Sequence, residues 1–200
     1  MNDKFFELKK EKQDRMINAA MKVFAMQGYK HASTDDIVKE AGISKGLLFH
    51  YFESKLGAYE FIYEYSVRYM VLELSTMVSK SETNLIEVMK QTEFARMHAM
   101  REYPYMQQFL NRAMSEDVGE ALLATEETRA ILEQEYNRIR SQIHFTGFPS
   151  GVDGRKLYKM MDYTIKGLLT ERFMENSFQP EMFYEEVSEY LDMMKHLVVR

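Results

Sequence analysis

Apolar residues recur every three or four positions along most of the chain, which is the spacing of amphipathic helices. Met16, Ile17, Ala20, Val23 and Phe24 follow this spacing and predict one long N-terminal helix. Glycine and proline interrupt helices, and they number only 9 and 3 among 200 residues. The pattern therefore predicts an all-α protein, with helices over residues 6–27, 34–41, 45–51, 55–79, 84–103, 105–114, 121–143 (with a break near Thr125), 154–176 and 180–198.

The second and third predicted helices are short and joined by a glycine turn. Ser33 can cap the first of them, and Asp36 follows at the spacing of a capping box. Gly42 can end that helix in the left-handed conformation, and Ser44 can cap the next. Two short helices joined in this way are typical of a helix-turn-helix, whose second helix enters the DNA major groove. The segment therefore predicts DNA binding.

The residues around this motif also resemble a known family, the tetracycline-repressor (TetR) family of one-component regulators. The likeness covers about the first quarter of the chain, and residue types and spacings match together. It rests on Ile17, Ala19, Ala20, Phe24, Gly28, Tyr29, Ser33, Asp36, Ile37, Ala41, Gly42, Ser44, Lys45, Gly46, Leu48, Tyr51, Phe52 and Lys55. The resemblance implies a homodimer with an N-terminal three-helix helix-turn-helix domain over residues 1–54. It also implies a larger helical domain for effector binding and dimerisation over 55–200.

The resemblance assigns the DNA contacts to the recognition helix and its flanks. Lys45 and Leu47 would face base edges, Gly46 would allow close backbone approach, and Tyr51 and Lys55 would hold phosphates. The predicted DNA-binding residues are Ser33, Ser44, Lys45, Gly46, Leu47, His50, Tyr51 and Lys55.

Two departures from the family pattern concern the recognition helix, and a third follows it. The family usually has Tyr at the position of Phe49, and a small residue at that of Leu47. A leucine there offers no hydrogen bond but can contact a thymine methyl group. Residues 56–58, Leu-Gly-Ala, also differ from the family, which puts in doubt how the next helix packs at its start.

Charge is distributed unevenly. Residues 1–55 hold 10 Lys and Arg against 8 Asp and Glu, a net charge of +2, whereas residues 56–200 hold 16 against 23, a net charge of −7. Because phosphate binding depends on local charge, this asymmetry is compatible with DNA binding by the N-terminal part. The chain has no cysteine, no apolar signal sequence at its charged N-terminus and no stretch long enough to cross a bilayer. We therefore expect a cytoplasmic protein that does not bind membranes.

Beyond residue 55 the sequence is rich in methionine and aromatic residues, which serve most often as core. The resemblance implies an effector cavity here for a small, apolar or aromatic molecule, with Tyr65, Tyr69, Phe94, Met97, His98, Phe109 and Tyr136 as predicted lining. The last two helices carry apolar stripes that could exceed what one core buries. In the family, the equivalent helices pair with those of a second subunit, so the predicted interface comprises Leu157, Met161, Ile165, Leu168, Val187, Leu191 and Met194.

Two alternatives stay open at this point. Gly42-Ile43-Ser44-Lys45-Gly46 matches the G-x-S-x-G motif of serine hydrolases, but that motif requires a strand before the serine and a sheet to carry it. Phe49 and Leu47 weakly favour the other alternative, a helical interaction module without DNA binding. No metal-ligand spacing and no nucleotide-binding loop is present, so the sequence predicts neither cofactor nor catalysis.

Overall fold

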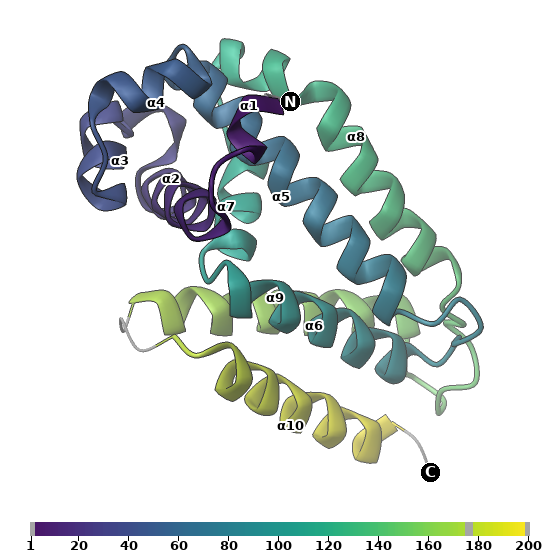
Figure 1. Ribbon diagram of the computed structural model, residues 1–200. Coiled ribbons are helices and arrows are strands. Elements are labelled where there is room, and N and C mark those ends of the chain that lie inside the picture. Colours follow the sequence, from purple (N-terminus) through teal and green to yellow (C-terminus); the bar gives the residue numbers. More distant parts are fainter. Residues whose placement is uncertain (1–2, 175–177, 199–200) are drawn as a thin grey trace. The chain divides into compact units, whose positions relative to one another are not determined.

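The computed structural model describes residues 3–174 and 178–198, and in these ranges it contains ten α-helices and no strand. This confirms the all-α class (Figure 1). The helices are α1 (Asp3–Phe6), α2 (Lys10–His31), α3 (Thr34–Ala41), α4 (Lys45–Phe52), α5 (Lys55–Met77), α6 (Leu85–Glu102), α7 (Met106–Met114), α8 (Gly119–Ser141), α9 (Gly154–Met174) and α10 (Pro180–Val198).

The predicted helices agree with these elements in order and approximate length, with two differences. The N-terminal segment is split, because α1 forms a separate turn before α2. The break predicted near Thr125 is wrong: α8 continues through it, and the Thr125 hydroxyl donates to the carbonyl of Ala121 at 2.8 Å. The end predicted for the eighth helix, Asn176, lies outside the described residues.

The chain forms two compact units. Unit 1 comprises residues 1–69 and 103–132, and unit 2 comprises residues 70–102 and 133–200. The helices α5 and α8 each contribute residues to both units. The units therefore differ from the division predicted at residue 54, because α2 packs along α7 and draws residues 103–132 into the same unit as the helix-turn-helix.

Two clusters of aromatic side chains lie in the core of unit 1. Phe24 of α2 and Phe109 of α7 both contact Tyr59 of α5, with ring centroids 5.0 and 5.6 Å apart. A second cluster centres on Phe5, which is fully buried and lies 4.9 Å from Phe61 and 5.4 Å from Phe52. The separate α1 thus supplies an aromatic residue that fixes α4 to α5.

Unit 2 is built on α6, α9 and α10 in the lower part of Figure 1, and α10 packs against both of the other two helices. Ion pairs tie α10 to α6, among them Lys90–Asp192 at 2.6 Å. Inside the unit, the Glu93 carboxylate is buried and accepts from the Arg96 guanidinium at 2.5 Å. Burial raises the pKa of Glu93, and the neighbouring Arg96 opposes that shift. No helix among the described residues has both the length and the apolar character needed to cross a membrane.

Candidate nucleic-acid interface

The helix-turn-helix forms as the sequence predicts. The Ser33 hydroxyl accepts from the backbone N–H of Asp36 at 3.0 Å and caps α3. Gly42 ends α3 in the left-handed conformation, with φ of 61°. The Ser44 hydroxyl accepts from the N–H of Leu47 at 3.2 Å and caps α4. Ser44 therefore lies between two helices, which is not the strand-to-helix setting that a hydrolase nucleophile requires.

The two sides of α4 differ sharply in exposure. Leu48 and Phe52 are buried against the rest of unit 1. The opposite side is exposed and carries Lys45, Gly46, Phe49 and His50, while Leu47 is half-buried. A Cβ atom built at Gly46 would meet no atom within 4 Å, so the backbone there is open to a partner. Sequence reasoning did not select Phe49 as a contact, yet it is 37% exposed on this face.

The junction between α4 and α5 is tightly packed. Glu53 ends α4 with φ of 62°, which is uncommon for a residue other than glycine. A Cβ atom at Gly57 would lie 2.1 Å from the Phe52 carbonyl oxygen, so only glycine fits at this place. The departure of residues 56–58 from the family pattern thus has a structural reason, since it lets α5 begin directly against the end of α4.

A set of hydrogen bonds around Tyr29, here called the Tyr29 joint, holds the base of the helix-turn-helix. Lys55 donates through its ammonium group to the carbonyl oxygens of Tyr29 at 2.9 Å and Ala32 at 3.3 Å. Glu116 accepts from the Tyr29 N–H at 3.1 Å, and Glu120 accepts from its hydroxyl at 2.5 Å. Burial, together with this bond to Glu120, raises the pKa of Tyr29 above its ordinary value. Two of the three Lys55 donors are thus engaged within unit 1, and its phosphate contact stays a prediction for the third.

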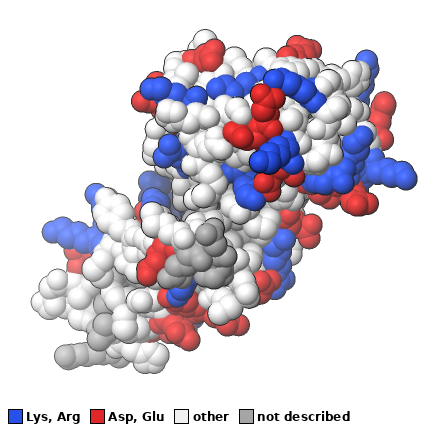
Figure 2. Space-filling view, turned by 90° about the vertical axis from the view of Figure 1, so that its left-hand side faces the viewer, with Lys and Arg blue, Asp and Glu red and all other residues white. Residues whose placement is uncertain are grey.

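Acidic side chains accompany the lysines on α3 and α4. Lys45 forms an ion pair with Asp35 of α3 at 2.8 Å. At the other end of α3, Glu40 pairs with Lys22 of α2 at 2.6 Å. The upper part of Figure 2 shows the helix-turn-helix side of unit 1. Acidic side chains lie there among the basic ones. The predicted DNA-facing surface is therefore not a continuous basic patch.

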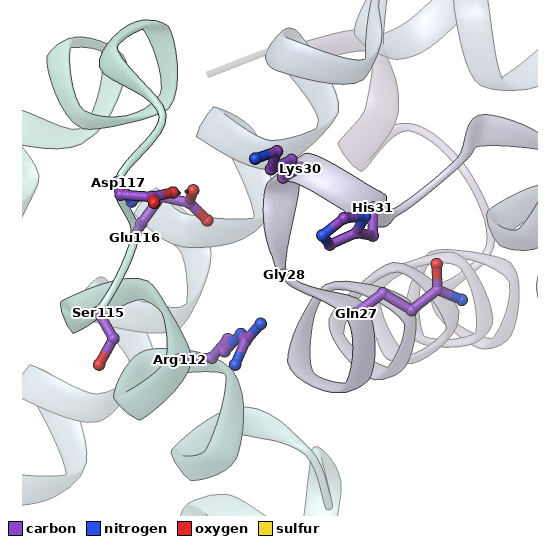
Figure 3. A pocket seen from close by; sticks show the side chains of 8 residues that line it. All are labelled: Gln27, Gly28, Lys30, His31, Arg112, Ser115, Glu116 and Asp117. Carbon is purple, nitrogen blue, oxygen red and sulfur yellow. Dashed lines mark hydrogen bonds between the residues drawn. The ribbon is translucent and has the colours of Figure 1, made fainter.

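A polar pocket of about 230 Å³ lies near the C-terminal end of α2, where Gly28 interrupts the helix (Figure 3). Gly28 at this point has φ of 70° and ψ of 172°, a conformation almost restricted to glycine. A Cβ atom on it would lie 3.0 Å from Nε of Arg112, so the guanidinium packs directly over the glycine backbone. The pocket is lined by Gln27, Gly28, Lys30, His31, Arg112, Ser115, Glu116 and Asp117.

The seven residues predicted to bind an effector are divided between the two units. In unit 1, Phe109 is buried in the aromatic core, and Tyr65 and Tyr69 both make edge contacts with the ring of Tyr103. In unit 2, Met97 is buried and Phe94 contacts the ring of Tyr184. The other two are polar: Nδ1 of His98 lies 2.9 Å from Glu73, and the Tyr136 hydroxyl accepts from Arg96 at 3.3 Å. Each is therefore buried or lies beside an aromatic, hydrogen-bonding or charged neighbour, and effector binding stays a prediction.

The structure places most of the predicted dimer contacts inside unit 2. Leu157, Met161, Ile165, Val187 and Leu191 are buried within unit 2, and Leu168 and Met194 are half-buried. The five buried side chains pack in the core of unit 2, and the subunit interface stays a prediction. The outward faces of α9 and α10 carry other apolar residues instead, which are Met160, Tyr163, Met174, Met182, Tyr190 and Met193.

This fold and this motif define a class, the all-helical proteins with an N-terminal helix-turn-helix. Residues 16–57 match the sequence model of a family described as bacterial regulatory proteins, tetR family. The uncharacterized HTH-type transcriptional regulator YuxN of Bacillus subtilis is 48% identical over 46 residues, 23% of this chain and 16% of that protein. The uncharacterized HTH-type transcriptional regulator TtgW of Pseudomonas putida is 40% identical over 47 residues, 24% of this chain and 35% of that protein. The matched segment thus covers only a small part of either relative.

Solved structures extend the likeness to the whole fold. A TetR family transcriptional regulator from Chloroflexus aurantiacus has a TM-score of 0.64 at 17% identity, covering 99% of this chain and 98% of that one. The transcriptional regulator FadR from Bacillus subtilis, solved in complex with stearoyl-CoA, has a TM-score of 0.55 at 16% identity, covering 88% and 96%. Residues 16–57 thus match the tetR family of bacterial regulatory proteins, and the chain as a whole is similar in fold to solved TetR family regulators.

Replacing Gly28 tests the turn at the end of α2. Gly28→Ala should lower the free energy of unfolding by about 1–3 kcal/mol, because alanine is strained in this conformation. Gly46→Ala is the matched control: Gly46 lies inside a helix with open space around it, so alanine there should be neutral or stabilising by up to about 1 kcal/mol. Urea unfolding followed by circular dichroism measures both. Equal stabilities of the two variants would contradict the structural role of Gly28.

Lys55→Met tests the Tyr29 joint. Methionine keeps an apolar side chain of similar length but removes the donors to the Tyr29 and Ala32 carbonyl groups. We expect a loss of about 1–3 kcal/mol in unfolding free energy, because two partly buried acceptors lose their partner. Lys39→Met, at an exposed position of α3, should change stability by less than about 0.5 kcal/mol. Thermal and urea unfolding of both variants would measure this contribution to stability. If Lys55→Met left the unfolding free energy unchanged, phosphate contact would be the one role left for this lysine.

Proposed function

We propose that the protein is a cytoplasmic, dimeric one-component transcriptional repressor that binds a palindromic operator and is released by a small effector. The observation that carries this proposal is the exposed side of α4. Lys45 and His50 offer hydrogen-bond donors there, and Gly46 leaves the backbone open between them. A capped helix with such a face can enter a major groove, with its N-terminal residues at the base edges.

Phosphate contacts are proposed for the flanks of this helix. The N-terminus of α3, with Ser33 as its cap, presents backbone N–H groups that suit an anion. The half-buried Tyr51 follows on α4, and Lys55 begins α5. Because the Tyr29 joint already holds the Lys55 ammonium, its contribution to DNA affinity should be smaller than that of Lys45.

A second subunit is proposed to pack on the outward faces of α9 and α10. Met160 and Tyr163 are 51% and 60% exposed on α9, and Tyr190 and Met193 are 40% and 51% exposed on α10. Gly167 lies on the same side of α9, and a Cβ atom on it would meet nothing within 4 Å of its own chain. Glycine inside a helix costs stability, so a close approach by a partner helix would account for it. A two-fold dimer would present two recognition helices to two half-sites.

The effector is proposed to be apolar or aromatic and to bind among the methionine and aromatic side chains that follow residue 55. The pocket at the end of α2 is not a candidate, because its lining is polar and charged. A solved protein of similar fold, FadR from Bacillus subtilis, holds stearoyl-CoA, so long-chain acyl-CoA is a sensible first compound to test. An effector acts only if it binds the DNA-competent and DNA-incompetent arrangements with different affinity.

Selection of duplexes from a random pool, followed by a screen for small molecules that release them, tests the proposal as a whole. Enrichment of a palindrome bound in a salt-dependent manner would support a DNA-binding regulator. Failure to retain any duplex at low salt would favour the other candidate, a helical interaction module without DNA binding. Release by an apolar compound, and not by polar metabolites, would support the effector class.

Gly46→Glu tests whether α4 faces DNA. The side chain has room in the free protein, so the variant should fold and assemble normally. In the groove it would stand between helix and bases and repel phosphates, weakening operator binding at least about tenfold, or 1.4 kcal/mol. Gly119→Glu, another exposed glycine with open space, is the control and should bind like the parent. Undiminished binding by Gly46→Glu in an anisotropy assay would remove α4 as the recognition helix.

Met160→Arg tests the proposed subunit contact. An arginine on the outward face of α9 would place an unpaired charge in the interface and should raise the dimer dissociation constant at least about tenfold. Met114→Arg introduces the same change at a methionine that is 66% exposed on α7, and it should leave assembly unaltered. Light scattering over a concentration series measures both. Identical masses for the two variants at every concentration would mean that the contact lies elsewhere.

A further inference from the structure

The ion pair between Asp35 and Lys45 joins the first turn of α3 to the first turn of α4. Its atoms Oδ1 and Nζ are 2.8 Å apart, and the two side chains remain 71% and 53% exposed. Lys45 stands at the N-terminal end of the proposed recognition helix, where base edges are read. Any contact of Lys45 with DNA must therefore replace or share its contact with Asp35.

The charges around this ion pair leave few lysines available for DNA phosphates. Residues 33–55 contain three lysines and no arginine, against four acidic residues, so the segment has a formal charge of −1. Two of these lysines are engaged within the protein, Lys45 by Asp35 and Lys55 by the carbonyl groups of the Tyr29 joint. Phosphate attraction, which drives binding to any sequence, should accordingly be weak for this helix-turn-helix.

We propose that Asp35 is a specificity-determining residue, which competes with DNA phosphates for Lys45 and so restrains binding to unrelated sequences. The inference rests on the proposed function and deepens it. On random DNA, Lys45 would exchange one anionic partner for another, with little gain. At an operator, Lys45 can donate to guanine O6 and N7 while the rest of the helix fits the groove, and only there is the exchange favourable.

Asp35→Asn removes the carboxylate and keeps a similar shape. We expect affinity for a duplex of shuffled sequence to rise about three- to tenfold, because Lys45 becomes free to hold a phosphate. The slope of log affinity against log salt should steepen by roughly one unit, the signature of one added phosphate contact. Affinity for the selected operator should rise less, so the ratio of specific to non-specific binding falls.

The chain provides a matched control on the same helix. Glu40→Gln also removes one acidic charge from α3 and also breaks one exposed ion pair, that with Lys22. It leaves Lys45 and its partner untouched. The specificity ratio of Glu40→Gln should therefore equal that of the parent. An equal loss of specificity in the two variants would reduce the effect to net charge and overturn the proposal.

A double-substitution cycle separates competition for Lys45 from simple repulsion by Asp35. If Asp35 acts through Lys45, Asp35→Asn should have no effect on non-specific affinity in a Lys45→Gln background. The same rise in both backgrounds would overturn the assigned route. Salt-dependent operator binding by the parent, measured in the same titrations, tests the proposed function separately. A parent that binds no duplex would reject the proposed function, and this inference with it, whereas a binding parent with an unaffected Asp35→Asn variant would reject the inference alone.

Discussion

The placement of the helix-turn-helix within unit 1 depends on the hydrogen bonds around Tyr29. The chain leaves helical geometry at Gly28, and the backbone groups freed there must find partners, because unpaired buried polar groups cost free energy. Lys55 supplies donors to the carbonyl groups, and Glu116 accepts from the N–H group. These partners come from the start of α5 and from the segment before α8. Three separated parts of the chain are thus tied at one residue, and α3 and α4 are carried on that support.

The exposed side of α4 combines an open backbone with few free positive charges. Most DNA-binding surfaces obtain much of their affinity from phosphate attraction. Here acidic side chains lie among the lysines, and both Lys45 and Lys55 have partners inside the protein. Such a surface should have low affinity for DNA of arbitrary sequence, and its DNA recognition would depend on groove fit and base contacts. Leu47 and Phe49, which add apolar area without hydrogen bonds, are consistent with the same balance.

In unit 2, adjacent residues of one helix can lie in the core and on the surface. On α9, Met161 is buried, whereas the adjacent Met160 is 51% exposed. Successive residues differ by about 100° around a helix, so the next position along can face the opposite environment. Both α9 and α10 carry apolar residues on two sides, one buried and one exposed. The inward side packs within unit 2, and the outward side is the surface on which we propose that a second subunit packs.

The sequence by itself determined the all-α class, the order of the helices and the local form of the helix-turn-helix. These features follow from short-range chemistry: helical spacing of apolar residues, serine caps at Ser33 and Ser44, and the left-handed turn at Gly42. Tertiary structure decided which apolar stripe of α9 is buried, that Lys55 bonds backbone carbonyl groups, and that Asp35 meets Lys45. Apolar residues on two sides of one helix look equivalent in sequence, and ion pairs between helices depend on their packing. Such contacts join residues that are distant along the chain, and periodicity carries no information about them.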